Sequence, residues 1–227
     1  MIDRLITFLY WLNQRTWSTL LMRMLTRTVV QGRENVPREG PLILASNHLN
    51  NADPPVLTNT IPRRIFWMAK KELFDNPALG IPFRFFGYIS VRRFEADLGA
   101  LRRAQEALAR GRVLGMFPEG TRSRTGGLKE GEPGTALVAL RTGAPILPVA
   151  LWGTENVTIP RDLVRRTHIQ VRIGRPFHLT RTRRLTKQQV ADGTREIMER
   201  IAALLPEDRR GVYQTSTSPV TSATVAE

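Results

Sequence analysis

Short strand-like runs of apolar residues recur along this chain and alternate with segments in which apolar residues repeat at helical spacing. The strand-like runs occupy residues 41–45, 64–69, 88–91, 113–116, 146–151 and 169–173. The segments of helical spacing occupy residues 55–60, 95–110, 135–141 and 185–205. Strands that alternate with helices are typical of a sheet whose strands run mostly parallel. The sequence therefore predicts an α/β fold, with a mostly parallel mixed sheet flanked by helices.

The run at residues 41–45 leads directly into a polar loop that contains His48 and, five positions later, Asp53. A neutral imidazole can take a proton from an alcohol near pH 7, and a carboxylate on its other ring nitrogen fixes the tautomer. Residues at this spacing face different sides of a helix, so the pair needs a loop or a helix start. Asp53 precedes Pro54, which suits the first turn of a helix. The spacing predicts a general base with its orienting acid, or else a helix cap beside a loop histidine.

A second polar block, Phe-Pro-Glu-Gly-Thr-Arg-Ser, follows the run at residues 113–116 and contains Glu119 and Arg122. Ligands in α/β folds gather beyond the carboxyl ends of strands. Both polar blocks stand at such ends. We therefore expect His48 and Glu119 to converge on one site.

Four sequence blocks, taken in order, resemble those of the 1-acyl-glycerol-3-phosphate acyltransferases and related glycerophospholipid acyltransferases. They are Asn47-His48-x4-Asp53, Gly-Tyr-Ile-Ser-Val-Arg-Arg at 87–93, Phe-Pro-Glu-Gly-Thr-Arg-Ser at 117–123, and Ala-Pro-Ile-Leu-Pro-Val-Ala at 144–150. The likeness extends from residue 29 to residue 177. The second block departs from the family pattern, because Arg92 stands where an aspartate is common and Ser90 where a proline or phenylalanine is common.

The resemblance implies a glycerolipid acyltransferase-like fold and an O-acyltransferase of phospholipid biosynthesis. Such an enzyme moves an acyl group from an acyl thioester, carried by coenzyme A or acyl carrier protein, to the free hydroxyl of 1-acyl-glycerol 3-phosphate (lysophosphatidic acid). The product is phosphatidic acid. Glycerol 3-phosphate and other lysophospholipids stay open as alternative acceptors. The resemblance also implies peripheral or monotopic attachment at the cytoplasmic face of a membrane.

Within this reaction His48 is the expected base and Asp53 its orienter. Glu119 is expected either to position the acceptor through its glycerol hydroxyl or to support the folded loop. Gly120 permits a sharp turn of the backbone. The remaining motif residues are expected to support the loops; they are Asn47, Thr121, Ser123 and Pro145.

Three basic residues are candidates for binding the substrate phosphate. Arg93 and Arg122 offer paired guanidinium donors that match phosphate oxygens. Lys70 stands at the end of the strand-like run at 64–69. Each has a plainer alternative, which is an ion pair with a nearby acid for the arginines and solvation at the surface for the lysine.

The composition limits the chemistry of this site. The chain has no cysteine and three histidines, so a thiol nucleophile is excluded and a zinc site has almost no ligands. No Gly-x-Ser-x-Gly sequence offers an activated serine. We therefore expect direct transfer, with the acyl thioester as co-substrate and no metal or cofactor. Backbone N–H groups near His48 are the expected donors to the developing oxyanion.

The formal net charge of +14 calls for an anionic partner, and the N-terminal segment favours a membrane surface. Residues 1–24 place apolar side chains on one helical stripe, with aromatic residues and arginines suited to a headgroup boundary. The longest uncharged run, residues 5–14, is far shorter than the ~20 apolar residues of a membrane span. An interfacial helix is expected, although a helix packed on the protein's own core has the same pattern. The segment lacks the features of an export signal.

The expected organisation is amphipathic anchoring helices over residues 1–27, one α/β domain over 28–205 and a disordered tail over 206–227. A basic nucleic-acid-binding protein is the rival of another class, but no helix-turn-helix or base-stacking strand stands out, so we expect no nucleic-acid partner. A third reading is a non-catalytic lipid-binding scaffold, which would not require His48.

Overall fold

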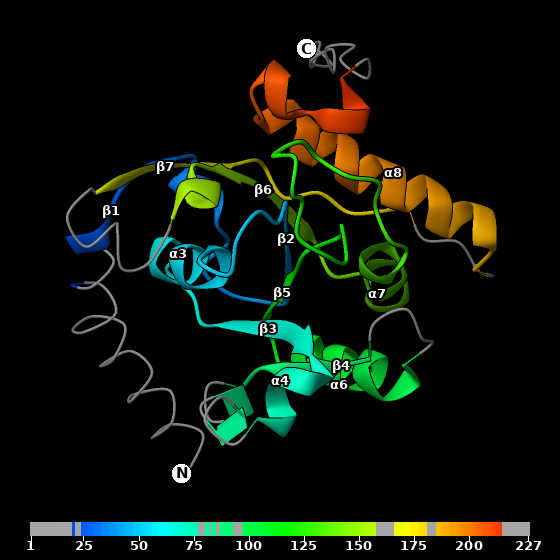
Figure 1. The fold of residues 1–227 in the computed structure, drawn as a ribbon. Helices are drawn as coiled ribbons and strands as arrows, with labels where there is room; N and C mark the ends of the chain where they lie inside the picture. Colours follow the sequence, from blue (N-terminus) through cyan, green and yellow to red (C-terminus); the bar gives the residue numbers. More distant parts are fainter. Residues whose placement is uncertain are drawn as a thin grey trace.

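The computed structural model describes residues 20, 24–76, 80–81, 83–84, 87–92, 97–157, 166–180 and 185–214. Within these residues, seven strands form one sheet in the order β1-β7-β6-β2-β5-β3-β4 (Figure 1). The strands are β1 Thr26–Gln31, β2 Leu42–Ser46, β3 Ile65–Lys70, β4 Ile89–Val91, β5 Val113–Met116, β6 Ile146–Trp152 and β7 Thr167–Ile173. The α-helices are α3 Asp53–Thr60, α4 Lys71–Asp75, α6 Leu98–Ala109, α7 Gly134–Thr142 and α8 Lys187–Leu204. Short 3-10 helices are η2 Arg33–Asn35, η3 Thr154–Asn156, η5 Glu207–Arg209 and η6 Gly211–Tyr213.

The central strands run parallel, which confirms the predicted fold class. β2 lies between β5 and β6 and is parallel to both, and β3 continues the parallel set outward to β4. The direction changes once, between β6 and β7, which pair antiparallel, while β1 is parallel to β7. The carboxyl ends of β2, β5 and β6 therefore lie side by side at one edge of the sheet.

Helices cover the sheet on both faces, because alternate side chains of the central strands enter two separate cores. Leu42 and Leu44 of β2 pack with α3 on one face, whereas Ile43 and Ala45 pack with α6, α7 and α8 on the other. Figure 1 shows α3 on one side of the central strands and α7 and α8 on the other. Burial on both faces makes each central strand apolar throughout, and this is the pattern that identified the strands in the sequence.

The boundaries of the predicted helices lie close to those in the structure. Capping residues explain where α6 and α8 begin and where α7 ends. Asp97 accepts a hydrogen bond from the Ala100 N–H and so begins α6. Thr186 and Gln189 form a reciprocal capping box at the start of α8. Gly143 ends α7 in the left-handed conformation, with φ of 69°.

Both ends of the described chain differ from expectation. β1 begins at Thr26 and pairs with β7, so the sheet starts inside the segment that was expected to be anchoring helices; residues 1–19 and 21–23 lie outside the described residues. Residues 206–214 pack against the domain instead of belonging to a disordered tail, and residues 215–227 lie outside the described part. We call residues 207–213 the C-terminal strap. None of the helices in the described part is long and apolar enough to cross a bilayer.

Candidate active site

The loops that follow β2 and β5 meet because these two strands are parallel neighbours. Ala45 pairs with Met116 at the carboxyl end of each strand. Asn47 and His48 follow the first strand, and the second block begins at Phe117, directly after the other. The sheet order thus brings the two polar blocks to one place, as the sequence predicted.

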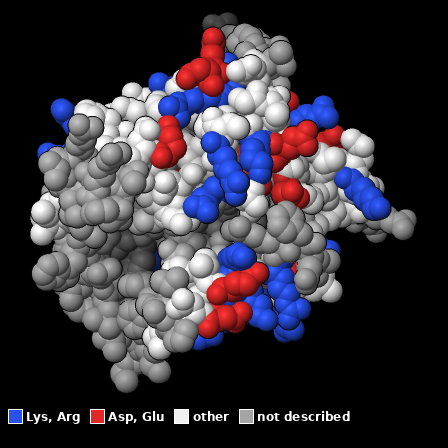
Figure 2. Space-filling model, viewed as in Figure 1, with Lys and Arg blue, Asp and Glu red and all other residues white. Residues whose placement is uncertain are grey.

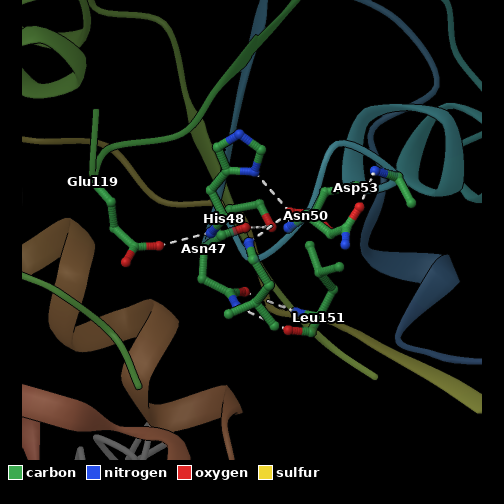
Figure 3. A network of polar contacts seen from close by, with 9 residues as sticks. Asn47, His48, Asn50, Asp53, Glu119 and Leu151 are labelled. Atoms are coloured by element: carbon green, nitrogen blue, oxygen red, sulfur yellow. Dashed lines mark hydrogen bonds and ion pairs between the residues drawn. The ribbon is translucent and has the colours of Figure 1, made fainter. Parts of the chain in front are cut away.

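The Asp53 carboxylate is turned back toward the loop and holds the His48 imidazole. Its Oδ2 atom accepts hydrogen bonds from His48 Nδ1 at 2.7 Å, from the Leu49 N–H at 2.6 Å and from the Asn50 N–H at 2.8 Å. Asp53 is completely buried, and its Oδ1 atom has no hydrogen-bond partner among the described residues. Since an ionised carboxylate only accepts, Nδ1 carries the ring proton and Nε2 presents its lone pair. Figure 3 shows this second nitrogen facing away from the network.

Two aromatic rings fix the plane of the imidazole. His48 stacks on Phe117 with ring centroids 4.0 Å apart, and Phe117 stacks in turn on Trp67 at 5.0 Å. Trp67 is fully buried in β3 and its indole N–H donates to the Thr58 hydroxyl. The sequence analysis assigned no role to Phe117 or Trp67, although the position of Phe117 directly before Pro118 and Glu119 was a usable signal.

The side chain of Asn47 extends the β2–β6 ladder beyond the end of β2. Its amide nitrogen donates to the Leu151 carbonyl oxygen at 2.8 Å, and its Oδ1 atom accepts from the Leu151 N–H at 2.9 Å (Figure 3). The amide thus replaces a backbone partner for Leu151. This arrangement fixes the residue directly before His48.

The loop after β5 holds the main chain of His48 at both of its polar groups. Glu119 Oε1 accepts from the His48 N–H at 2.7 Å, and the His48 carbonyl oxygen accepts from the Ser123 N–H at 2.7 Å. Glu119 Oε2 accepts from the Lys129 N–H at 3.0 Å. Both carboxylate oxygens of Glu119 are therefore engaged by backbone, which is the geometry of the loop-supporting alternative.

Glu119 is 2% exposed, and its ionisation reflects this burial. Burial raises the pKa of its carboxyl to about 7, against the lowering effect of the two backbone N–H donors and of the Lys129 ammonium, while the charge of Asp53 adds to the rise. A carboxyl that titrates in this range is common at functional sites. The Glu119 carboxyl, which joins the two loops, therefore changes its charge near neutral pH.

The smaller residues of the second and fourth blocks shape the loops around these groups. Gly120 has φ of 67°, so the turn needs a residue that tolerates the left-handed region. The Thr121 hydroxyl accepts from Lys129 Nζ at 2.6 Å, and the Ser123 hydroxyl donates to the Gly127 carbonyl oxygen at 2.6 Å. The Pro145 carbonyl oxygen accepts from the Ile43 N–H and aligns β6 with β2.

The candidate phosphate ligands lie in three different situations. The side chain of Arg122 is exposed beside the residues that hold His48, and it makes no hydrogen bond or ion pair with other described residues. Lys70 stands at the carboxyl end of β3 and forms an exposed ion pair with Glu72 at 3.5 Å. Arg93 lies outside the described residues. Lys129, which the sequence analysis did not single out, adds an ammonium group beside Thr121.

Charge on the described surface is mixed in this region. On the face shown in Figure 2, Lys and Arg side chains gather near the middle of the view, and Asp and Glu side chains lie close beside them. The described residues of this face therefore do not form a uniform basic layer.

The expectation that backbone N–H groups near His48 meet the developing oxyanion stays a prediction, and four of these groups are already engaged. The N–H groups of His48, Leu49, Asn50 and Asp53 already donate to Glu119, to the Asp53 carboxylate or to a loop carbonyl oxygen.

A groove of about 730 Å³ is formed by α7, α8 and the C-terminal strap, and it contains none of the predicted site residues.

Comparisons with known proteins identify the family of the chain. A family model described as Acyltransferase matches residues 27–152, which is more than half of the chain. A 1-acyl-sn-glycerol-3-phosphate acyltransferase from Borreliella burgdorferi is 34% identical over 135 residues, covering 59% of this chain and 54% of that protein. One from Bacillus subtilis is 29% identical over 178 residues, covering 77% of this chain and 86% of that protein.

A solved structure shares the fold. The crystal structure of the 1-acyl-sn-glycerophosphate (LPA) acyltransferase PlsC from Thermotoga maritima superposes with a TM-score of 0.68 at 25% sequence identity, over 87% of this chain and 79% of that chain. The present chain spans about half the length of several curated relatives that it matches, such as 54% of the Borreliella protein and 49% of one from Brassica napus.

Proposed function

Because the chain belongs to the Acyltransferase family, we propose that it transfers an acyl group from an acyl thioester to the free hydroxyl of 1-acyl-glycerol 3-phosphate, giving phosphatidic acid. The observation that carries the proposal is the contact of 2.7 Å between His48 Nδ1 and Asp53 Oδ2. It leaves Nε2 as the basic nitrogen of the site. The names of the relatives support the choice of acceptor.

The proposed reaction is a direct transfer. His48 Nε2 takes the proton of the acceptor hydroxyl as the oxygen attacks the thioester carbonyl carbon, and Asp53 stabilises the imidazolium that forms. The tetrahedral intermediate then collapses, the carbon–sulfur bond breaks, and the imidazolium returns its proton to the departing thiolate. No acyl-enzyme is needed, since the hydroxyls of Ser46 and Ser123 donate to the backbone carbonyl oxygens of Asn47 and Gly127 rather than to His48.

Arg122 is proposed to bind the phosphate of the acceptor. It lies one residue before Ser123, whose N–H holds the His48 carbonyl oxygen, so its backbone is fixed close to the base. Its exposed guanidinium is available for two parallel hydrogen bonds to phosphate oxygens. Lys70 lies at the same edge of the sheet, and we propose it as a second, weaker contact.

We propose that the enzyme works at the cytoplasmic face of an anionic membrane, with coenzyme A or acyl carrier protein as the acyl carrier and no cofactor. The amphipathic pattern of residues 1–24 supports attachment without a membrane-spanning segment. Liposome sedimentation of the full chain and of a chain that lacks residues 1–24 tests this attachment. Equal sedimentation of the two would place the anchor elsewhere.

The test of the function is thiol release from acyl-CoA and acyl carrier protein with lysophosphatidate, glycerol 3-phosphate and other lysophospholipids as acceptors. The wild type should turn over lysophosphatidate fastest. His48→Ala should lower kcat by about 10³-fold or more, the size of a general-base contribution, with an unchanged melting temperature. His168→Ala is the matched control, because His168 is exposed on β7, which is separated from β2 by β6 in the sheet order. Near-normal turnover by His48→Ala would refute the proposed base.

A further inference from the structure

The C-terminal strap packs directly on the segment that holds Glu119. The Leu128 N–H donates to the Arg209 carbonyl oxygen at 3.1 Å, and the Val212 N–H donates to the Leu128 carbonyl oxygen at 3.2 Å. The Tyr213 hydroxyl accepts from the Gly131 N–H at 3.3 Å. The strap thus forms hydrogen bonds with backbone groups of Leu128 and Gly131, on both sides of Lys129. The N–H of Lys129 itself donates to Glu119.

The strap is anchored to the body of the domain as well. Arg209 Nη1 forms a half-buried ion pair with Glu155 Oε1 at 2.5 Å, and Glu155 Oε2 accepts from the Gly153 N–H at the end of β6. Tyr213 packs against the core beneath α8. Figure 1 shows the strap lying across α8, near the end of the described chain. The strap is held at several points and is therefore able to fix the position of residues 128–131.

A continuous line of contacts runs from the strap to the catalytic base. It passes from the strap to Leu128 and Gly131, through the Lys129 N–H to Glu119, and from Glu119 to the His48 N–H. We propose, on the basis of the acyltransferase function proposed above, that Gly211 and Tyr213 are positioning residues, which hold His48 in its reactive place through the 128–131 segment and Glu119.

Gly211 is the point where strap and segment approach most closely. It has φ of 53°, and a Cβ atom added there would collide with the carbonyl oxygen of Leu128. Gly211→Ala must therefore displace the 128–131 segment. Gly40→Ala is a matched control, since Gly40 has φ of 82°, so the backbone is strained in the same way, but nothing lies within 4 Å of the added methyl group.

Displacement of the segment has an electrostatic consequence that a general loss of stability does not have. The Lys129 N–H favours the ionised form of Glu119, and the groups that face this carboxyl are the His48 N–H, the Lys129 N–H and ammonium, and the Asp53 carboxylate. Loss of the Lys129 hydrogen bond raises the pKa of Glu119 further. The low-pH decline of kcat should then move to higher pH.

The experiment compares wild type, Gly211→Ala and Gly40→Ala by pH-dependent kinetics and by amide hydrogen exchange. Gly211→Ala should lower kcat about tenfold with an acceptor KM within about twofold, because the base is misplaced while the phosphate contact stays. The low-pH decline should move upward, and exchange should quicken at residues 128–131 and 47–49. Gly40→Ala should show none of these changes. In a Glu119→Gln background, Gly211→Ala should add little to the loss of kcat, because both changes act on one contact.

Tyr213→Phe carries the test if Gly211→Ala does not fold, because it removes only the hydroxyl that accepts from Gly131. It should give a smaller kcat loss of about two- to threefold and faster exchange at residues 128–131. Equal kinetics and exchange in Gly211→Ala and Gly40→Ala would overturn the positioning role. Absence of acyl transfer by the wild type would instead refute the proposed function, and the exchange at residues 47–49 would still decide whether the strap positions His48.

Discussion

The loop after β2 is closed mainly by its own Asp53, whereas the loop after β5 is held by the C-terminal strap as well as by its own contacts. In the first, Asp53 closes the loop on itself by accepting from Leu49, Asn50 and the imidazole. The second loop, residues 117–133, is longer; it contacts His48, and its own residues 128–131 contact both Glu119 and the C-terminal strap. A short loop can encode its geometry in a few neighbouring residues, but a long one needs partners from distant parts of the chain.

The strongest test of this contrast is Asp53→Ala. It removes the acceptor of three hydrogen bonds and the charge that stabilises the imidazolium, so kcat should fall by about 10³-fold, close to the full contribution of a general base. Steady-state kinetics, with a thermal melt of the same sample, measure it. A loss below tenfold would mean that the first loop does not depend on its own carboxylate.

Asp53→Asn should lower kcat less than Asp53→Ala, because the backbone around residue 53 orients the new side chain. Two backbone N–H groups point at Oδ2, so an asparagine there would place its carbonyl oxygen at this position and keep Nδ1 protonated. Only the charge is then lost, and we expect about a 10²-fold fall in kcat, less than a wrong tautomer causes in serine proteases. A fall as large as that of Asp53→Ala would show that the tautomer was not preserved.

Glu119→Gln tests the contact that joins the two loops. The amide imitates the protonated carboxyl at every pH and cannot accept at both ends, so kcat at pH 8 should fall about tenfold, the cost of one unsatisfied buried donor. Wild-type kcat should fall as the pH drops through about 7, where Glu119 becomes protonated, and the variant should lack that contribution. A pH profile of the variant identical to that of wild type would assign the decline to another group.

The same carboxyl makes a signed prediction for stability. Its pKa is about 7 in the folded protein and near its usual 4.5 in the unfolded chain, so the folded state binds the proton more tightly. The stability of wild type relative to Glu119→Gln is therefore greatest below pH 4.5 and is lost as the pH rises from 4.5 to about 7. Urea unfolding of both proteins across this range measures the difference.

Arg122→Ala tests the outer side of the second loop, where the effect should be confined to binding. The acceptor KM should rise by about tenfold or more, as expected for the loss of charge-assisted hydrogen bonds to the phosphate, with the melting temperature unchanged because the side chain is exposed. Arg122→Lys should recover part of this affinity, since it keeps the charge without the paired donors. An effect on the thioester KM alone would reassign Arg122 to the acyl carrier.

Thr121→Val should have the smallest effect. It removes the acceptor of the Lys129 ammonium at an exposed position, so stability should change by about 0.5 kcal/mol or less. Chemical denaturation measures it, with kcat as a second readout. A loss above 2 kcal/mol would mean that the second loop has an internal support as strong as that of the first.

The contrast between the two loops also explains which features of the site can be predicted from the sequence. His48 and Asp53 share one local segment, and β2 and β5 have unmistakable apolar patterns, so the contact between His48 and Asp53 and their convergence with Glu119 were predictable. The support of Leu128 by Arg209 and Val212 uses backbone atoms only, and these leave no trace in the choice of side chains. The sequence therefore predicts a disordered tail where the structure has the strap.

Two further differences between the structure and the predictions from sequence have physical causes. Glu119 accepts from backbone at both oxygens, and the residue type alone does not distinguish this from a contact with substrate. β1 was missed because its few residues follow a strongly helical pattern, although Thr26, Thr28 and the neighbouring valines have the β-branched character of a strand.

The pairing of β1 with β7 has a consequence for the way the molecule is made. Among the described strands, β1 has no neighbour in the sheet other than β7, and Thr26 pairs with Thr167. During synthesis on the ribosome, β1 emerges long before β7 and must wait without this partner while the middle of the chain is translated. The central strands can assemble during this interval, so closure of the sheet at that edge is a late event of biogenesis.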